Sequence, residues 1–500
     1  GYNDRTGSSY EDTAGYNYGL GINPFGQVAG SKVFDNNANW SNPDYTELIA
    51  DAYQRGARIS SNSWGASAGQ GRYRVYDQTY DTLVRDADPD TPGNQAMVVI
   101  FSAGNSGPNT QTVGSPANAK NVITVGAAEN VRPTWTDGCG YSPTIADNAN
   151  DIAPFSGRGP TTDGRVKPDL VAPGTHIIGA TSQAEGYTGR NVCDPYYPPE
   201  QMLYAASSGT SHATPAVAGA ASLLIRRYEV WSGAPPSPAM VKALLLNTAR
   251  YLNGLDSGDT LPSYRQGYGE VNIAGALTDT ARILVDQSEI LRTTGETYVR
   301  HGHVSRVSEP VRVTLAWTDA PGATIGNAYV NDLDLTVEIS GATYLGNVFD
   351  GAYATPGGTH DRANNVESVS LPPGAQGPLT ITVRAYNLAG DGRPGDSDPT
   401  DQDFALVCTN CEPEPAFELE AQPLRVDLCA SERTTYTITP YARNGFSGSI
   451  SLEASGYPTG TSATFDPNPS PANIPSHLTL ETSPDANQDA YPVRITGTDS

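Results

Sequence analysis

The sequence predicts an α/β protein built on a doubly wound, mostly parallel sheet, followed by two antiparallel β-sandwiches. In the first half, short apolar runs alternate with segments whose apolar residues recur at helical spacing. From about residue 298, apolar and polar residues alternate strictly between turns rich in Gly and Pro. A stretch rich in Pro and Glu at 411–416 then precedes a last group of short strand-like runs.

The first half contains the elements of the predicted parallel sheet. Residues 1–22 are rich in Gly, Tyr, Asn and Asp without periodicity, and we expect a long loop there. Strands are expected at 27–34, 59–63, 97–103 and 122–127, and helices at 45–55, 76–86, 213–227 and 238–248. Strands that alternate with helices predict a parallel sheet covered on both faces, with its ligand site at the carboxyl ends of the strands.

The second half predicts two β domains. Alternating runs at 311–317, 333–339 and 379–385 are typical of one β-sandwich. Short runs at 418–428, 435–439, 449–454, 478–481 and 493–498 indicate strands of an immunoglobulin-like module, cut short at residue 500. We therefore expect domains at 1–284, 285–410 and 417–500, with 411–416 as a linker.

Composition restricts the partners of the protein. The chain carries 54 Asp and Glu against 30 Lys and Arg, a net charge of −24. Nucleic acids and anionic membranes are disfavoured as partners because their phosphates would be repelled. No apolar run approaches the roughly 18 residues that a membrane span needs. We expect a monomer without a nucleic-acid partner or a membrane span.

Five cysteines point to disulfides. No His or Asp stands near them at the spacing of a zinc finger, so disulfides are favoured over a metal. Cys139 and Cys193 lie in loops of one predicted domain and are expected to pair. A redox role for Cys408 and Cys411 is disfavoured because they do not open a helix. Disulfides fit a secreted protein, and the odd count predicts that one cysteine lacks a partner in this chain.

The stretch 209–219, GTSHATPAVAG, holds the most informative serine. Ser211 stands where a small-residue turn meets an expected helix, so unpaired backbone N–H groups can hold a developing negative charge there. A hydroxyl nucleophile that attacks a carbonyl needs this arrangement and a base. A lone Gly-Thr-Ser is more often a helix cap. The whole run, however, resembles the nucleophile segment of subtilisin-like serine proteases.

Three further segments resemble the same family in the same order. The run MVVIFSAGNSG at 97–107 resembles the strand that delivers the asparagine of the oxyanion hole, here Asn105. The run ISSNSWG at 59–65 resembles the strand that lines the substrate groove, and 154–174 the segment that leads to the nucleophile. The resemblance covers roughly residues 20–280.

The resemblance implies a secreted endopeptidase that cleaves polypeptides through an acyl-enzyme on Ser211, without a cofactor for the chemistry. Asn105 and the Ser211 N–H would stabilise the oxyanion. The residues implied to bind substrate are Ser63, Trp64 and Gly65 along its backbone, Ser102, Ala103 and Gly104 as a pocket wall, and Thr210.

The catalytic histidine and aspartate of this family are not identified in the chain. His176 is the single histidine before Ser211, in an apolar segment that indicates a structural role, and His212 is expected to point away. We expect the missing pair, a signal peptide and a propeptide to lie upstream, and residues 1–500 alone to be inactive. The alternatives are a pseudoprotease or a binding scaffold that uses the β domains. An esterase is disfavoured because G-T-S-x-A differs from the G-x-S-x-G elbow.

The first β domain carries a second resemblance. The run LAWTDAP…NDLDL…NNVE…ITVRAYN is similar to the jelly-roll domain that follows the catalytic domain in a branch of alkaline subtilases. Asp332 and Asp334 there share one strand face and repel each other unless a cation or hydrogen bonds compensate. A structural calcium ion and a solvated polar face are both open. Subtilases commonly bind calcium, as the resemblance implies without naming residues.

Overall fold

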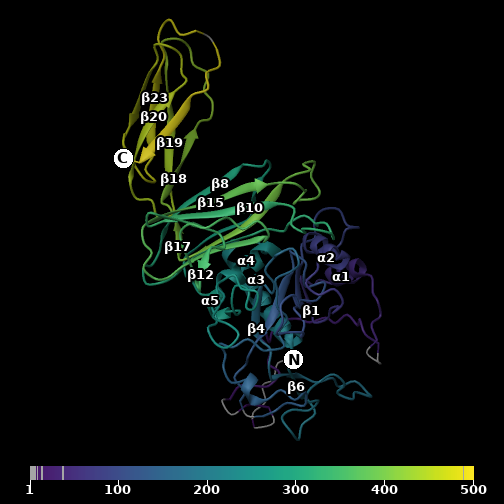
Figure 1. Ribbon diagram of the computed structural model, residues 1–500. Coiled ribbons are helices and arrows are strands. Elements are labelled where there is room, and N and C mark those ends of the chain that lie inside the picture. Colours follow the sequence, from purple (N-terminus) through teal and green to yellow (C-terminus); the bar gives the residue numbers. More distant parts are fainter. Residues whose placement is uncertain are drawn as a thin grey trace. The chain divides into compact units, whose positions relative to one another are not determined.

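The computed structural model describes residues 7, 10–12, 15–35, 39–133, 135–487 and 489–499 (Figure 1). The chain divides into two compact units, Gly1–Cys411 and Glu412–Ser500, which are described separately below.

A parallel sheet organises the first unit. Its strands lie in the order β1 (Ile59–Asn62), β2 (Val98–Ser102), β3 (Ile123–Ala128) and β4 (Leu170–Pro173), and every neighbouring pair is parallel. The helices are α1 (Tyr45–Gln54), α2 (Val75–Arg85), α3 (Thr210–Ser232), α4 (Pro238–Asn247) and α5 (Ile273–Leu277). The predicted alternation of strands and helices is thus confirmed.

Side chains of β2 alternate between two cores, one on each face of the sheet. Val98 and Ile100 pack with residues of α3 and α4. Val99 and Phe101 pack with residues of α1 and α2. Because successive side chains of a strand point to opposite faces, the four apolar residues of this strand serve both layers, as a doubly wound sheet requires.

Two of the expected elements differ in the structure, and β4 and α5 were not expected. Residues 27–34 form no strand; Phe34 makes an isolated bridge to Trp40, and Val28 is 96% exposed. Within the described residues this segment pairs with no strand that would share its backbone hydrogen bonds, so its local sequence alone does not make it a strand. Helix α3 is longer than the expected 213–227, since it begins at Thr210 and ends at Ser232. Gly233 caps it with a left-handed φ of 77°.

The rest of the first unit is mainly antiparallel. One sheet has the order β11-β10-β15-β8-β17 and the other β14-β9-β16-β7. Their strands are β7 (Arg282–Leu291), β8 (Thr297–Val304), β9 (Val311–Ala316), β10 (Asp332–Ile339), β11 (Ala342–Leu345), β14 (Val366–Leu371), β15 (Pro378–Asn387), β16 (Gln402–Thr409) and β17 (Cys411–Pro413). Two-stranded pairs are β5 (Ile177–Ala180) with β6 (Tyr204–Ser207) and β12 (Phe349–Asp350) with β13 (Tyr353–Ala354); a 3-10 turn spans Pro143–Ile145. The two larger sheets share one hydrophobic core, with Leu335, Ile381 and Phe404 among its members.

The β14-β9-β16-β7 sheet also packs on the α/β part, as the adjacent ribbons of α4 and the green strands suggest (Figure 1). Ala316 of β9 and Ala405 and Val407 of β16 belong to the same core as residues of α4. The boundary predicted between 284 and 285 therefore falls inside one compact unit. The boundary between the units, between Cys411 and Glu412, falls within the predicted linker and within β17.

Buried ion pairs join these two parts. The Arg85 guanidinium on α2 donates two hydrogen bonds of 2.7 Å to the Asp403 carboxylate on β16. Lys120 Nζ lies 2.6 Å from Asp319 Oδ2, and both side chains are 0% exposed. Such pairs must stay intact because a buried charge that loses its partner is strongly destabilising.

We expect Lys120→Met to destabilise the first unit by about 3–5 kcal/mol, because it leaves the Asp319 carboxylate buried without its cation. The measurement is the midpoint of thermal and urea unfolding. Arg55→Met is the matched control, since its ion pair with Asp51 is exposed on α1 and should contribute little. Equal effects of the two substitutions would contradict this prediction.

The second unit is antiparallel throughout its described strands. Its sheets have the orders β18-β19-β23-β21 and β22-β20-β24 around a core that includes Ile438, Leu452 and Leu478. The strands are β18 (Ala416–Gln422), β19 (Arg433–Arg443), β20 (Ser449–Ser455), β21 (Ser462–Asp466), β22 (Ser470–Pro471), β23 (Ser476–Glu481) and β24 (Arg494–Asp499). The predicted strands are found, although the first ends at Gln422 and β21 and β22 were not expected.

The cysteines form two disulfides. Cys139 pairs with Cys193 at a Cα separation of 4.7 Å, as predicted. Cys408, near the end of β16, pairs with Cys411 at the start of β17. Cys429 is exposed and has no disulfide partner within the described part of the chain.

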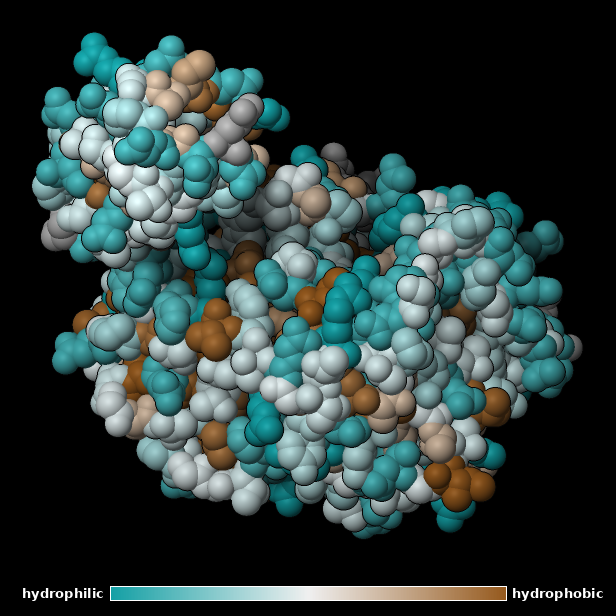
Figure 2. Space-filling model, turned by 90° about the horizontal axis from the view of Figure 1, so that it is seen from above, coloured by the Kyte–Doolittle hydropathy of each residue, from teal (hydrophilic) through white to brown (hydrophobic). Residues whose placement is uncertain are grey.

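Most of the face in Figure 2 is hydrophilic or intermediate, and its hydrophobic residues lie in small scattered groups. Scattered apolar residues are normal on protein surfaces and do not by themselves mark a docking site. None of the helices in the described ranges is both long and apolar enough to cross a membrane.

Candidate active site

Ser211 lies at the start of a long helix, where the sequence placed it. Helix α3 begins at Thr210, one residue earlier. The Ser211 hydroxyl lies 3.4 Å from the carbonyl oxygen of Ser63, and the Ser63 hydroxyl donates to the Ser211 carbonyl at 2.9 Å. Since Ser63 follows β1, the helix start meets the carboxyl end of the parallel sheet, which is where such sheets bind ligands.

The side chain of Asn105 is oriented by Thr210. Its Oδ1 accepts hydrogen bonds from the backbone N–H of Thr210 at 2.8 Å and from the Thr210 hydroxyl at 2.9 Å. Two donors on one side of the amide identify that atom as the oxygen. The Nδ2 group is then left as a donor, and within the described residues no acceptor binds it.

Gly209 opens the space in front of these donors. A Cβ atom at this position would lie 3.2 Å from Asn105 Nδ2 and 3.7 Å from the backbone nitrogen of Ser211. Its φ of 149° is also one that side chains rarely allow. One side-chain donor, Asn105 Nδ2, and one backbone donor, the Ser211 N–H, therefore adjoin a position that only glycine leaves empty. Such a position suits an oxyanion.

Thr210 differs from its expected place in the substrate groove. Its side chain is 0% exposed, and its hydroxyl binds Asn105 and accepts a hydrogen bond of 3.2 Å from the Gly104 N–H. These contacts make Thr210 a group that positions Asn105. The sequence could have suggested this role. A threonine at a helix start commonly uses its hydroxyl for hydrogen bonds to neighbouring groups there.

The other expected groove residues follow the first two strands. Ser63 and Gly65 are exposed after β1, whereas the Trp64 ring packs against Tyr45 and Phe101 with centroids 5.4 and 5.2 Å apart. The Trp64 side chain thus belongs to the core, which leaves its backbone for any substrate contact. Ser102 and Ala103 at the end of β2 are buried, and Gly104 is half-buried.

No histidine among the described residues forms a hydrogen bond with the Ser211 hydroxyl. His212 is half-buried, and burial lowers the pKa of its imidazole. His176 is fully buried, and its ring nitrogens face the carbonyl oxygens of Arg132 and Tyr141. These contacts agree with the structural role expected for His176.

Asp332 and Asp334 have a protein cation as their partner. The Arg362 guanidinium donates to Asp332 at 3.2 Å and also to Asp334, beside which His360 Nδ1 lies at 3.4 Å. Burial raises the pKa of Asp332 to about 6, and Arg362 opposes this rise. The guanidinium takes the position a metal would need between the carboxylates, so this pair does not fit calcium.

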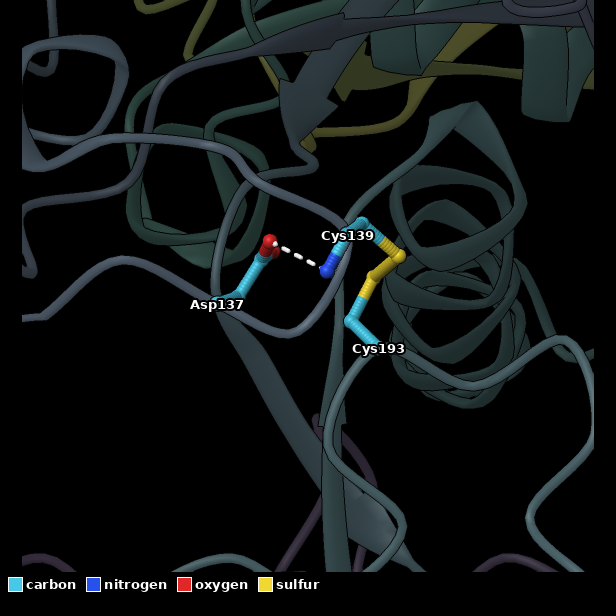
Figure 3. Close-up of side chains that lie close together, drawn as sticks. All are labelled: Asp137, Cys139 and Cys193. Carbon is cyan, nitrogen blue, oxygen red and sulfur yellow. Dashed lines mark hydrogen bonds between the residues drawn. A yellow bond between two sulfur atoms is a disulfide. The ribbon is translucent and has the colours of Figure 1, made fainter.

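Two other clusters bring potential metal ligands together within the described chain. The oxygens of Glu129, Asp147 and Asp151 approach within 4.8 Å of one another. The second cluster is Asp137, Cys139 and Cys193, but both sulfur atoms are bonded to each other (Figure 3). A cysteine binds a metal as its thiolate, and these two cysteines are joined in a disulfide. The second cluster therefore does not fit a metal site.

The fold and the helix-start serine define the class of the protein as a serine-type hydrolase on an α/β scaffold. The model of the subtilase family matches residues 2–269, more than half of the chain. The chain belongs to the subtilase family of serine-type peptidases, which need no cofactor for their chemistry.

Individual relatives are similar over parts of the chain. The serine protease/ABC transporter B family protein tagD of Dictyostelium discoideum is 27% identical over 449 residues, which cover 66% of this chain and 24% of tagD. Serine protease AprX of Bacillus subtilis is 34% identical over 191 residues, 38% of this chain and 37% of AprX. The structure of the prenylagaramide maturation protease PagA is 25% identical, with a TM-score of 0.34, over 49% of this chain and 70% of that chain. This chain thus matches only 24% of the length of tagD and 37% of that of AprX.

Proposed function

We propose that Ser211 is the nucleophile of an endopeptidase that cleaves polypeptides. The observation that carries this proposal is the single space, kept open by Gly209, that adjoins both Asn105 Nδ2 and the Ser211 N–H. Thr210 aims the amide of Asn105 so that its donor side is free. Two N–H donors beside one open space are the arrangement that stabilises the oxyanion of an acyl-transfer transition state.

The reaction has two steps. In the first, Ser211 Oγ bonds to the peptide carbonyl carbon and loses its proton to a base, and the carbonyl oxygen becomes an anion beside Asn105 and the Ser211 N–H. The C–N bond then breaks as the base returns the proton to the leaving amine. In the second step, water attacks the acyl-enzyme through the same anion and frees Ser211.

The substrate contacts of the proposal follow from the strand ends. The exposed backbone at Ser63 and Gly65 would pair with an extended substrate in β fashion, beside a wall formed by Ser102, Ala103 and Gly104. We further propose a secreted protein, supported by its disulfides and acidic charge. The two sheets of β7–β17 and the second unit are proposed to be a jelly roll and an immunoglobulin-like module.

We expect residues 1–500 alone to hydrolyse casein at a rate near the detection limit. A serine hydroxyl is a weak nucleophile without an adjacent base, and Ser211 binds none within the described residues. The oxyanion site and groove alone leave about 10³–10⁴-fold acceleration over the uncatalysed rate, well below a complete triad. The measurement is casein hydrolysis by the purified chain.

A longer chain that adds the family's histidine and aspartate segments should hydrolyse casein strongly. Its Ser211→Ala variant, which cannot form the acyl-enzyme, is the control. Strong hydrolysis by residues 1–500 would show that this chain already holds a base. Inactivity of every longer form would favour the other proposal, a pseudoprotease or binding scaffold.

A further inference from the structure

The ring of His176 lies between two hydrogen-bond acceptors. Its Nδ1 is 3.2 Å from the carbonyl oxygen of Arg132, and its Nε2 is 3.3 Å from that of Tyr141. A carbonyl oxygen only accepts, so each ring nitrogen satisfies its neighbour only as a donor. A neutral imidazole donates from one nitrogen, whereas an imidazolium donates from both. The side chain is 0% exposed, so bulk solvent does not reach either ring nitrogen.

A buried imidazolium needs a counter-charge, and Asp137 supplies one. Asp137 is buried, and its Oδ2 lies 3.8 Å from His176 Nε2. The indole of Trp135 stacks on the imidazole with centroids 4.5 Å apart, a contact that favours a cation over the ring face.

Other charged and titratable groups around the ring have different partners or stay neutral. The Arg132 guanidinium pairs with Asp12 at 3.2 Å, and Asp194 accepts from the Trp135 indole at 3.4 Å. Burial raises the pKa of Tyr141, and Asp137 adds to this rise. Burial likewise raises the pKa of Tyr197, which stacks on Trp135. Asp137 is thus the carboxylate nearest the ring among the described residues.

The Asp137–His176 pair reaches the turn before the nucleophile through Ser208. The Ser208 hydroxyl donates to Asp137 Oδ2 at 2.8 Å and accepts from the His176 backbone N–H at 2.9 Å. The Gly209 N–H then donates to the Gly174 carbonyl at 2.7 Å. Ser208 is therefore held from both sides, directly before the glycine that leaves space for the oxyanion.

Backbone hydrogen bonds and a nearby disulfide hold Asp137 in place opposite His176. Asp137 Oδ1 accepts the N–H groups of Cys139 and Tyr141, both at 3.0 Å, and Cys139 is bonded to Cys193 (Figure 3). His176 itself has a left-handed backbone with a φ of 49°. Such a conformation persists where its surroundings over-determine it, and it is common near functional sites.

We propose that His176 is a buried imidazolium whose ion pair with Asp137 positions residues 208–211, and with them the Ser211 nucleophile and its oxyanion space. His176 and Asp137 are positioning residues, since neither contacts Ser211. The effect on catalysis rests on the function proposed above, whereas the protonation and the order of the turn do not.

The first experiment measures protonation and order in residues 1–500. With ¹⁵N-labelled histidine, both ring nitrogens of His176 should carry protons at neutral pH in nuclear magnetic resonance spectra. Loss of that signal in His176→Gln identifies it, and His301→Gln, an exposed site on β8, is the control. Hydrogen exchange of a peptide spanning 205–212 should be faster in Asp137→Asn than in the wild type. A single protonated ring nitrogen, or unchanged exchange, would overturn the proposal.

The second experiment is a double-mutant cycle in a longer chain that adds the family's histidine and aspartate segments and hydrolyses casein. Asp137→Asn should lower kcat about 10²-fold with little change in KM, because it misplaces Ser211 and leaves the imidazolium unpaired. Adding His176→Gln removes the unpaired charge and should recover about tenfold of this loss, a non-additive result that two independent structural defects would not give. Asp350→Asn, at an exposed site of β12, is the control.

The outcomes separate this inference from the proposed function. Additive losses in kcat, or a lower melting temperature with unchanged kcat, would contradict the positioning role. Absence of activity in the wild-type longer chain would count against the proposed function, and the first experiment would still decide the protonation and the order of the turn.

Discussion

In a longer chain that supplies the proposed histidine and aspartate, replacing Ser211 with alanine is expected to lower kcat by about 10⁶-fold, a magnitude taken over from the loss of the nucleophile in a subtilisin. The hydroxyl is the atom that bonds to the substrate, so the acyl-enzyme cannot form without it. Helix α3 should survive, because Ser211 is only half-buried and alanine is a good helix former. Peptide hydrolysis and labelling by a fluorophosphonate are the two measurements.

Ser222→Ala provides the matched control for this prediction. Ser222 lies on the same helix, and its hydroxyl donates to the Gly219 carbonyl rather than to any group of the site. Its activity and labelling should equal those of the wild type. If the Ser211→Ala variant were still labelled at the normal rate, another residue would be the nucleophile.

Replacing Asn105 with alanine is expected to lower kcat by about 10²–10³-fold and to leave KM nearly unchanged, again a magnitude taken over from a subtilisin. The amide would donate to an oxygen that is fully charged only in the transition state, so substrate binding should lose little. Steady-state kinetics on a short peptide substrate separates the two constants.

Thr210→Val tests how the amide of Asn105 is held. This variant keeps Asn105 and the Thr210 backbone N–H but removes the hydroxyl that binds Oδ1 at 2.9 Å. We expect a smaller fall in kcat than for Asn105→Ala, because one of the two bonds that orient the amide remains. An effect of Asn105→Ala mainly on KM would instead indicate a residue that holds the substrate.

Local sequence patterns were sufficient for three of the four strands of the parallel sheet and for the helix that begins beside Ser211, whereas β4 was not among the expected strands and the strand expected at 27–34 does not form. The apolar run of β2 is buried on both faces, and the small-residue turn after it brings Asn105 to the end of the sheet. Ser211 falls at the start of α3 because a turn of small residues precedes a run with strong helix formers. Each of these features depends on neighbours within a few residues, which is the range that periodicity and capping report.

The sequence by itself thus determined the family, the doubly wound sheet, the helix-start serine and the Cys139–Cys193 disulfide. The tertiary structure alone decided which side chains complete the site and which parts fold together. Asn105 meets Thr210 across 105 residues of sequence, and Lys120 meets Asp319 across 199. Residues 27–34 form no strand because no strand pairs with them within the described chain, and Asp332 and Asp334 are bridged by Arg362 from another segment. Both outcomes depend on groups brought together by folding, and no local pattern encodes such distant contacts.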